Sequence, residues 1–283
     1  MKLTALFFFF TSAISVQAQF FSFQEDWFEN ESFFVDSIIS QRKIAAIHIW
    51  QREKKDGRHF KNERAFLHYE FNRSGQLKAS YKSIVLKNKI DTAIFLFSYN
   101  QKGQLYKQSQ QQGLFHFNYF YFYENNKLVK EIKIDVANNA IDTTYLHYFD
   151  HTTNNSSSRI TTLNALKKPF VYLDSEYNLN GQLILETKSY HRNQAFTETT
   201  YTYEEGNLIL VEKSNNRKSV FEKLTIDRKH EKLDLISLYQ DQELAKKHGF
   251  TYHLDGTPHA IIERNLEEMK ITIYRMEYLF YQD

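Results

Sequence analysis

One histidine-containing stretch begins like the zinc-binding helix of a metalloprotease. His230-Glu231-Lys232-Leu233-Asp234 has the first His and the Glu of that motif, but Asp234 stands where the second His ligand is required. The stretch follows Thr225-Ile226 and is basic and turn-like, so the helix that would align two ligands is missing. We therefore expect no metalloprotease chemistry from these residues.

Three further histidines and one carboxylate gather around a short turn near the C-terminal end. His248, His253, His259 and Asp255 would ligate a metal ion if a hairpin folded them together. The chain has 11 His, and separate solvent-facing imidazoles are the other interpretation of a His-rich sheet. We assign no metal ligand among them.

Motifs for other catalytic chemistry are absent from the sequence. It has no Gly-x-Ser-x-Gly elbow, no glycine-rich phosphate loop, no dinucleotide fingerprint and no obvious pair of facing carboxylates. It also has no Cys, which excludes disulfides, thiolate metal sites and a lipid anchor on an N-terminal Cys. We therefore predict that the protein is not an enzyme and has no catalytic, cofactor-binding or metal-binding residue and no cofactor.

The composition is that of an ordered, soluble protein. Of 283 residues, 42% are apolar and 25% are charged, and 36 basic against 34 acidic residues leave a net charge of +2. Such a small charge gives no field that would attract nucleic acid or anionic lipid. The length allows one large domain or two ordinary ones.

The N-terminal segment has the pattern of an export signal. Lys2 supplies a positive charge, and Leu3–Val16 is an uncharged, mostly apolar stretch that is shorter than the ~20 residues of a membrane-spanning helix. Val16-Gln17-Ala18 offers small residues to a signal peptidase, so we predict a signal peptide over residues 1–18, with cleavage between Ala18 and Gln19. A retained N-terminal anchor is the alternative. The prediction places the protein in the periplasm or outside the cell.

Most of the 8 Gly fall in one repeated context, in which an aromatic residue and Asn precede Gly, Gln and Leu. Near-copies or shortened versions occupy Phe71–Leu77, Tyr99–Leu105, Tyr123–Leu128, Tyr177–Leu183, Tyr203–Leu208 and Tyr252–Gly256. An aromatic ending one strand, Asn opening a turn, Gly in the left-handed conformation and Leu starting the return strand describe a hairpin. With the Asp56-Gly57 pair included, the predicted turn residues are Gly57, Gly75, Gly103, Asn126, Gly181, Gly206 and Gly256.

A second, weaker set of turn residues lies between these hairpins. It comprises Asn88, Gly113, Asn138-Asn139, Asn193 and Asn215-Asn216, and a degraded copy of the main turn lies near Tyr148–Asp150 and Asn154-Asn155. A reversal about every dozen residues predicts a β-meander of roughly sixteen strands. Alternating apolar residues support this, as in Leu67, Tyr69 and Phe71.

The segment before the first strand breaks the strand pattern. Within Gln24–Ser40, Asn30 could cap a helix that carries Phe33, Phe34, Ser37 and Ile38 at helical spacing. We predict that residues 19–40 form a short helical or irregular cap that shields the first strand, or alternatively a partner site. Residues 41–283 then form the hairpin-repeat domain.

The fold class we predict is all-β, an antiparallel β-meander of hairpin repeats forming an extended or curled sheet. The Tyr-Asn-x-x-Gly-Gln-Leu units resemble the YD repeats of Rhs-type exported bacterial proteins over about residues 41–260. That resemblance implies a continuous, curling antiparallel sheet that can enclose cargo or bind surface carbohydrate. Asn replaces the Asp of the family motif, the array is short and no toxin domain follows, so it implies fold more than function.

Three functions remain open. The first is a non-catalytic binding or scaffold module of the cell envelope or exterior, whose Tyr-rich face contacts a glycan, a peptide or an envelope protein, or else forms only the core. The second is an outer-membrane β-barrel, although Lys130 and Glu212 interrupt apolar strand faces. The third is an enzyme whose site is composed across strands. We favour the first, without nucleic acid, lipid anchor or membrane insertion.

Overall fold

The structure, a computed structural model, describes residues 34–86, 89–136, 142–154, 156–191, 195–217, 219–230 and 232–282. The predicted signal peptide, the cleavage point between Ala18 and Gln19, and Asn30 fall outside these residues. So do the predicted turns at Asn88, Asn138-Asn139 and Asn193.

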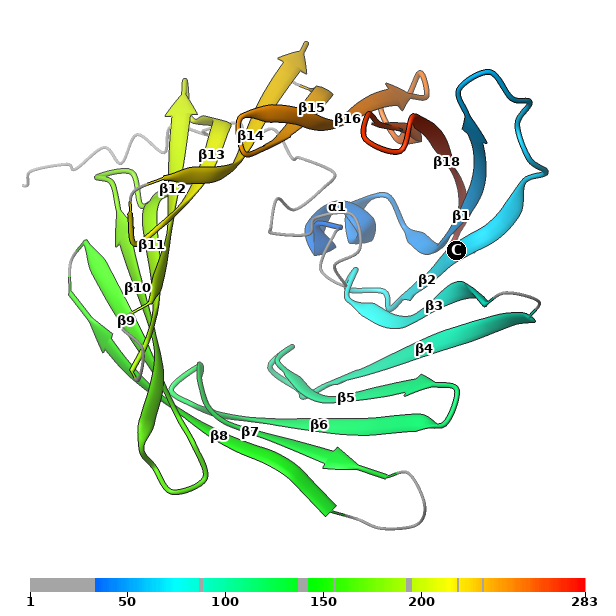
Figure 1. Cartoon of the computed structure of the whole chain (residues 1–283). Helices are drawn as coiled ribbons and strands as arrows, with labels where there is room; N and C mark the ends of the chain where they lie inside the picture. The colour runs from blue at the N-terminus through cyan, green and yellow to red at the C-terminus, as the bar shows by residue number, and fades with distance from the viewer. Residues whose placement is uncertain are drawn as a thin grey trace, which may run out of the picture.

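One short helix and eighteen strands make up the described chain (Figure 1). They are α1 (Asp36–Gln41), β1 (Ile44–Lys55), β2 (Arg64–Phe71), β3 (Leu77–Leu86), β4 (Lys89–Tyr99), β5 (Leu105–Gln112), β6 (Phe115–Glu124), β7 (Lys127–Asp135), β8 (Asp142–Thr153), β9 (Ser157–Leu163), β10 (Pro169–Tyr177), β11 (Leu183–Tyr190), β12 (Phe196–Glu204), β13 (Asn207–Asn215), β14 (Val220–Lys229), β15 (Lys232–Gln240), β16 (Glu243–Tyr252), β17 (Pro258–Asn265) and β18 (Lys270–Phe280). No helix within the described ranges is long and apolar enough to cross a membrane.

The predicted all-β, antiparallel meander is confirmed, with α1 as the short N-terminal helix. The described chain has more strands than the roughly sixteen predicted, because several reversals use residues other than Gly or Asn. Lys167, Asp241, Gln242 and Met269 take up positive φ at turns that the sequence did not reveal. The turn before β10 nevertheless copies the Asn-opened hairpins, since Asn164 Oδ1 accepts hydrogen bonds from the backbone N–H of Leu166 and of Lys168.

The meander closes on itself. Each strand pairs antiparallel with its neighbours in sequence, and β18 pairs with β1 from Ile44 opposite Phe280 to Lys55 opposite Lys270. The strands therefore form a ring around a central space, and α1 lies inside it (Figure 1). Closure removes the exposed edges that an open sheet would offer to other chains.

Alternate side chains of every strand form the inner wall of the ring. Phe34, just before α1, packs edge-on against Tyr69 at 5.2 Å between ring centroids, which identifies the face of β2 that points inward. Residues directly opposite each other on paired strands share a face. Tyr69 is opposite Ser80 of β3, and the successive opposite residues are then Phe95 of β4, Gln110 of β5 and Phe117 of β6. The inner wall therefore includes the odd-numbered residues of β6, whereas Phe120 and Phe122 face outward.

The hydrophobic core occupies the part of the ring around the closing strands. Ile38 and Ile39 of α1 pack there with Ile47 and Ile49 of β1 and with buried residues of β2–β4 and β14–β18. Burying an aliphatic side chain of this kind contributes ~1.5 to 3 kcal/mol. From β5 to β13, by contrast, Leu163 and Val211 are the only buried hydrophobic residues in the described ranges.

The repeated turns are linked to one another by side-chain hydrogen bonds. In the turn between β2 and β3, Asn72 Oδ1 accepts from the backbone N–H of Gln76 at 3.0 Å, and Gln76 Nε2 donates to the carbonyl of Gly103 in the next main turn at 2.8 Å. Gln182 reaches Gly206 in the same way at 3.0 Å. The Asn and Gln of the repeat therefore shape one turn and fasten it to the next.

The repeat tyrosines form a second set of links between neighbouring strands. Tyr99 donates its hydroxyl hydrogen bond to the carbonyl of Leu77 at 2.9 Å, and Tyr203 donates to Leu183 at 2.9 Å. Tyr252 donates to Leu233 at 2.8 Å, and burial raises its pKa to about 12, so its hydroxyl remains a donor. Each such bond contributes ~0.5 to 1.5 kcal/mol.

The predicted turn residues all have positive φ. The values are 74° at Gly57, 86° at Gly75, 76° at Gly103, 63° at Asn126, 76° at Gly181, 83° at Gly206 and 85° at Gly256. Gly75 has a second requirement, since a Cβ on it would lie 1.9 Å from the carbonyl oxygen of Asp36 in α1. The turn between β2 and β3 is thus the platform on which α1 rests.

A pair of substitutions separates these two requirements. Gly181→Ala places Ala at positive φ with no atom near its Cβ, and we expect it to cost roughly 1 to 2 kcal/mol of unfolding free energy. We expect Gly75→Ala to cost a further ~1 to 3 kcal/mol, because its methyl group overlaps the backbone of α1. Urea unfolding of both variants measures the difference. Equal losses would show that α1 does not dock on this turn in solution.

Candidate functional site

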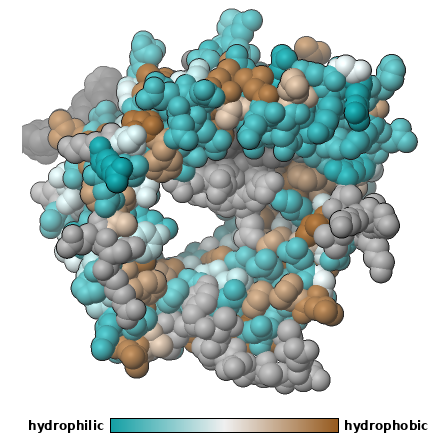
Figure 2. All heavy atoms as spheres, viewed as in Figure 1, coloured by the Kyte–Doolittle hydropathy of each residue, from teal (hydrophilic) through white to brown (hydrophobic). Residues whose placement is uncertain are grey.

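Beyond the core strands, the inner wall at β6 is lined by aromatic side chains. Phe117, Tyr119, Tyr121 and Tyr123 succeed one another along β6, and each is only half-buried. Figure 2 shows an opening through the ring, with hydrophobic and hydrophilic residues along its border. The wall therefore offers apolar rings and polar groups to a ligand from a single strand.

Polar partners hold the rings of β6 in place. Tyr121 donates a hydrogen bond to Gln108 Oε1 of β5 at 2.8 Å, and Lys133 Nζ of β7 lies 3.9 Å from the centroid of the Phe117 ring. The Lys133 ammonium also lies 5.4 Å from the Tyr119 ring. Rings fixed in this way lose little conformational entropy when a ligand binds.

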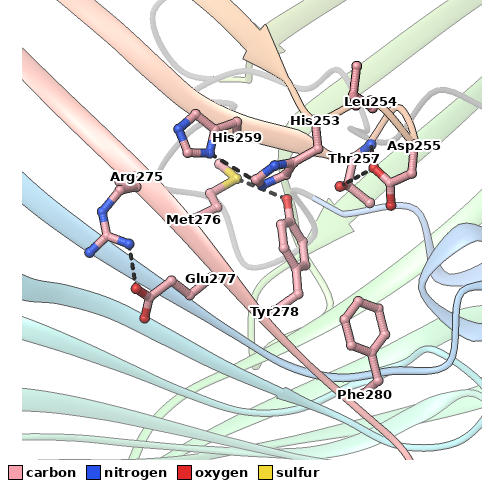
Figure 3. A pocket seen from close by; sticks show the side chains of 10 residues that line it. All are labelled: His253, Leu254, Asp255, Thr257, His259, Arg275, Met276, Glu277, Tyr278 and Phe280. Carbon is pink, nitrogen blue, oxygen red and sulfur yellow. Dashed lines mark hydrogen bonds and ion pairs between the residues drawn. The ribbon is translucent and has the colours of Figure 1, made fainter.

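A rim pocket of about 660 Å³ opens beside the turn between β16 and β17 (Figure 3). The turn contributes His253, Leu254, Asp255 and Thr257, and the strands contribute His259, Arg275, Met276, Glu277, Tyr278 and Phe280. His253 and His259 meet at its centre, where His253 Nε2 lies 3.3 Å from His259 Nδ1. The imidazole pair is therefore part of the lining of this pocket.

The histidines that the sequence grouped around this turn are only partly brought together. His248 lies on the inner wall, where its Nε2 is 3.2 Å from Glu263 Oε2 of β17. The carboxylate of Asp255 accepts hydrogen bonds from Thr257 and faces Arg42, and the Thr257 bonds hold its pKa below the usual range. Among the described residues, no group of three or more His, Asp or Glu is placed to hold a metal ion.

The zinc-protease-like stretch lies in sheet. His230 has a φ of 50° in the turn between β14 and β15, and Leu233 and Asp234 lie within β15. Side chains in a strand alternate between its two faces, so these residues lack the helical arrangement that would align two ligands.

An outer-face pocket of about 230 Å³ lies on the other side of the closing strands. His48 of β1 faces His68 of β2 with ring centroids 4.2 Å apart, and Tyr81 of β3 follows at 5.5 Å from His68. Trp50 borders this row and donates from Nε1 to Glu277 at 2.8 Å. The result is an aromatic row that crosses three strands.

The sequence did not single out this row. Its members lie on three strands, and only the register that places His48 opposite His68 brings them together. The hairpin signal at Asp56-Gly57 indicated that β1 and β2 would pair. The connection runs from Lys55 to Arg64, however, and a connection of that length does not fix which residues face one another.

Comparisons with known proteins give a weak structural likeness and no family. No protein-family model matches the sequence, and no curated protein matches it. A porin-like protein from Bacteroides uniformis is similar over 85% of this chain and 97% of its own, with 10% identity and a TM-score of 0.43. The TcdB2–TccC3–Cdc42 complex matches 75% of this chain with 18% of its own, at 11% identity and a TM-score of 0.28. A LolA superfamily protein from Nitrosomonas europaea has 8% identity and a TM-score of 0.21 over 88% of this chain and 91% of its own. Likeness at this level says nothing about what this chain binds or does.

The burial of His48 beside His68 predicts that stability depends on pH. Burial lowers the pKa of His48 from 6.5, and the neighbouring His68 lowers it further, whereas Glu277 opposes the shift. As the pH falls below 6.5, the unfolded chain therefore takes up this proton before the folded chain does, and the unfolding free energy decreases.

We expect His48→Asn to reduce this loss. The measurement is urea unfolding of the original chain and the variant at about pH 7.5 and about pH 5.5, on either side of the ordinary imidazole range. His191→Asn, on an exposed turn residue, is the control. An acid-induced loss that is as large in His48→Asn as in the original chain would contradict the assignment.

Proposed function

We propose that the chain is an exported, non-catalytic binding protein whose ligand contacts the inner wall of the closed sheet. The observation that carries the proposal is the row of partly exposed rings of Phe117, Tyr119 and Tyr121 on β6, in a part of the ring where few hydrophobic side chains are fully buried. Rings that served only as core would be covered, as they are beside α1. Partly exposed rings on a wall facing an opening are available to a ligand.

The chemistry of the wall indicates an amphipathic ligand. Tyr rings offer apolar area together with a hydroxyl, Gln108 and Gln110 add amide groups, and Lys133 with Glu131 adds charges of both signs. With no dominant charge on this wall, a polyanion gains little there. A peptide or a glycan chain has both apolar faces and hydrogen-bonding groups, so we propose one of these as the ligand.

Two features of the sequence complete the proposal. The signal-like segment at residues 1–18 implies export, so that the ligand would belong to the cell envelope or the exterior. The hairpin units resemble YD repeats, and we propose that the chain belongs to that repeat type. A repeat of this kind builds a wall from many similar strands, on which inward residues vary without changing the fold.

The binding proposal is tested on β6, where adjacent residues face opposite sides. The purified chain is applied to glycan and peptide arrays, and affinity for any ligand found is measured for Tyr121→Ser and Phe120→Ser. We expect Tyr121→Ser, on the inner wall, to weaken binding at least about tenfold, or about 1.4 kcal/mol. Phe120→Ser, which removes a ring from the outer face, should leave affinity unchanged. Absence of any ligand, or an equal loss in both variants, would refute the proposal.

Closure of the sheet favours a second candidate, an outer-membrane β-barrel. The outer face weighs against it, because Arg159 of β9 forms an ion pair with Asp174 of β10, with bonds of 2.5 and 2.8 Å. Lys223 and Glu212 lie 3.6 Å apart on the same face. Charges on a lipid-facing strand cost up to ~2 to 4 kcal/mol each at mid-bilayer.

Fractionation of cells that express the chain distinguishes the two candidates. The binding protein is expected in the soluble fraction after lysis and in the supernatant of high-speed centrifugation. Recovery in the membrane pellet that resists carbonate and is released only by detergent would instead support the barrel.

A further inference from the structure

Two imidazole nitrogens face each other in the lining of the rim pocket. His253 lies in the turn after β16, and His259 follows Pro258 at the start of β17. Their rings are inclined at 71° with centroids 4.6 Å apart, so they do not stack face to face. Instead, Nε2 of one ring lies 3.3 Å from Nδ1 of the other, as Figure 3 shows.

This separation matches that of two ligands on one metal ion. Imidazole nitrogens bind Zn²⁺ at about 2.0 to 2.1 Å, and two such bonds at the tetrahedral angle place the nitrogens about 3.3 to 3.4 Å apart. A metal ion would therefore replace the hydrogen that His253 and His259 share in this contact, with the two nitrogens close to their present separation. The backbone already supplies the spacing, because the turn and the strand are joined by a short hairpin.

We propose that His253 and His259 form a two-imidazole site for a borderline divalent transition ion, Zn²⁺, Cu²⁺ or Ni²⁺. Imidazole suits these ions, whereas Mg²⁺ and Ca²⁺ prefer oxygen ligands. Asp255 does not complete the ligand set, since its carboxylate is held by Thr257 and Arg42. The remaining coordination positions open into the pocket, where water or a small ligand completes the shell.

The charges around the pair permit a cation. The Asp255 carboxylate interacts electrostatically with His253, and Glu277 borders the same pocket. The positive charge of Arg275 is offset by Glu63 at 2.7 Å and by an ion pair with Glu277. Arg42 is in turn directed at Asp255 at 3.4 Å. Arg42 and Arg275 are thus each paired with a carboxylate, which limits their repulsion of a bound metal ion.

The test uses the full chain purified without a polyhistidine tag. Zn²⁺, Cu²⁺ and Ni²⁺ are titrated separately by calorimetry, and Mg²⁺ serves as a metal ion that the site should not bind. We expect one ion per chain, and at least a tenfold loss of affinity in His253→Ala and in His259→Ala. The spin-resonance spectrum of the Cu²⁺ complex should show two nitrogen ligands.

His48→Ala is the matched control, because it removes one ring from an imidazole pair that meets with ring centroids 4.2 Å apart. It should bind the ions as the original chain does. Urea unfolding shows whether each variant is folded. If His259→Ala does not fold, His253→Ala, which changes a turn residue, still tests the site. Absence of stoichiometric binding, or binding that survives loss of both His253 and His259, would overturn the proposal.

Discussion

The pairing of β1 with β18 is the contact on which the rest of the structure depends. Without it, the meander would be an open sheet with two unpaired edges and a single hydrophobic patch. The core lies where it stabilises this contact, because α1 places Ile38 and Ile39 against β1 from inside the ring. Tyr281 adds a hydrogen bond across β1 to the carbonyl of Phe71 in β2. Long-range closure is thus supported by burial, the strongest available term.

The remaining strands are stabilised differently. From β5 to β13 both faces of the sheet are partly exposed, so burial contributes less and links between neighbouring strands contribute more. The Gln side chains join successive turns, and tyrosines such as Tyr203 join strand ends to the preceding hairpin. Because these links are local, they hold the wall without filling the space inside it. An open inner wall is therefore a consequence of the repeat and not a defect of packing.

Local chemistry accounts for what could be predicted from the sequence. Gly and Asn mark turns because they tolerate positive φ, so the hairpins at Gly75, Gly103 and Gly181 could be predicted, while the reversal at Lys167 could not. The closed ring was not predictable, since nothing near Ile44 or Phe280 in sequence records that they will pair. The two imidazole pairs differ in the same respect, because the sequence groups one of them and not the other. His253 and His259 flank one turn and were grouped correctly, whereas His48 and His68 depend on the register between two strands.

The repeat separates the residues that make the fold from those available for binding. Turn residues and linking tyrosines lie at the ends of strands, whereas Tyr119 and Tyr121 lie within β6 and take no part in the turns. Substitution within a strand therefore changes the wall without loosening the hairpin. The rim pocket, by contrast, is built on residues that also make the fold. The turn that contains His253 pairs Asp255 with Arg42, the residue that follows α1. Metal bound there would therefore act on the part of the ring that holds the helix and the closing strands together.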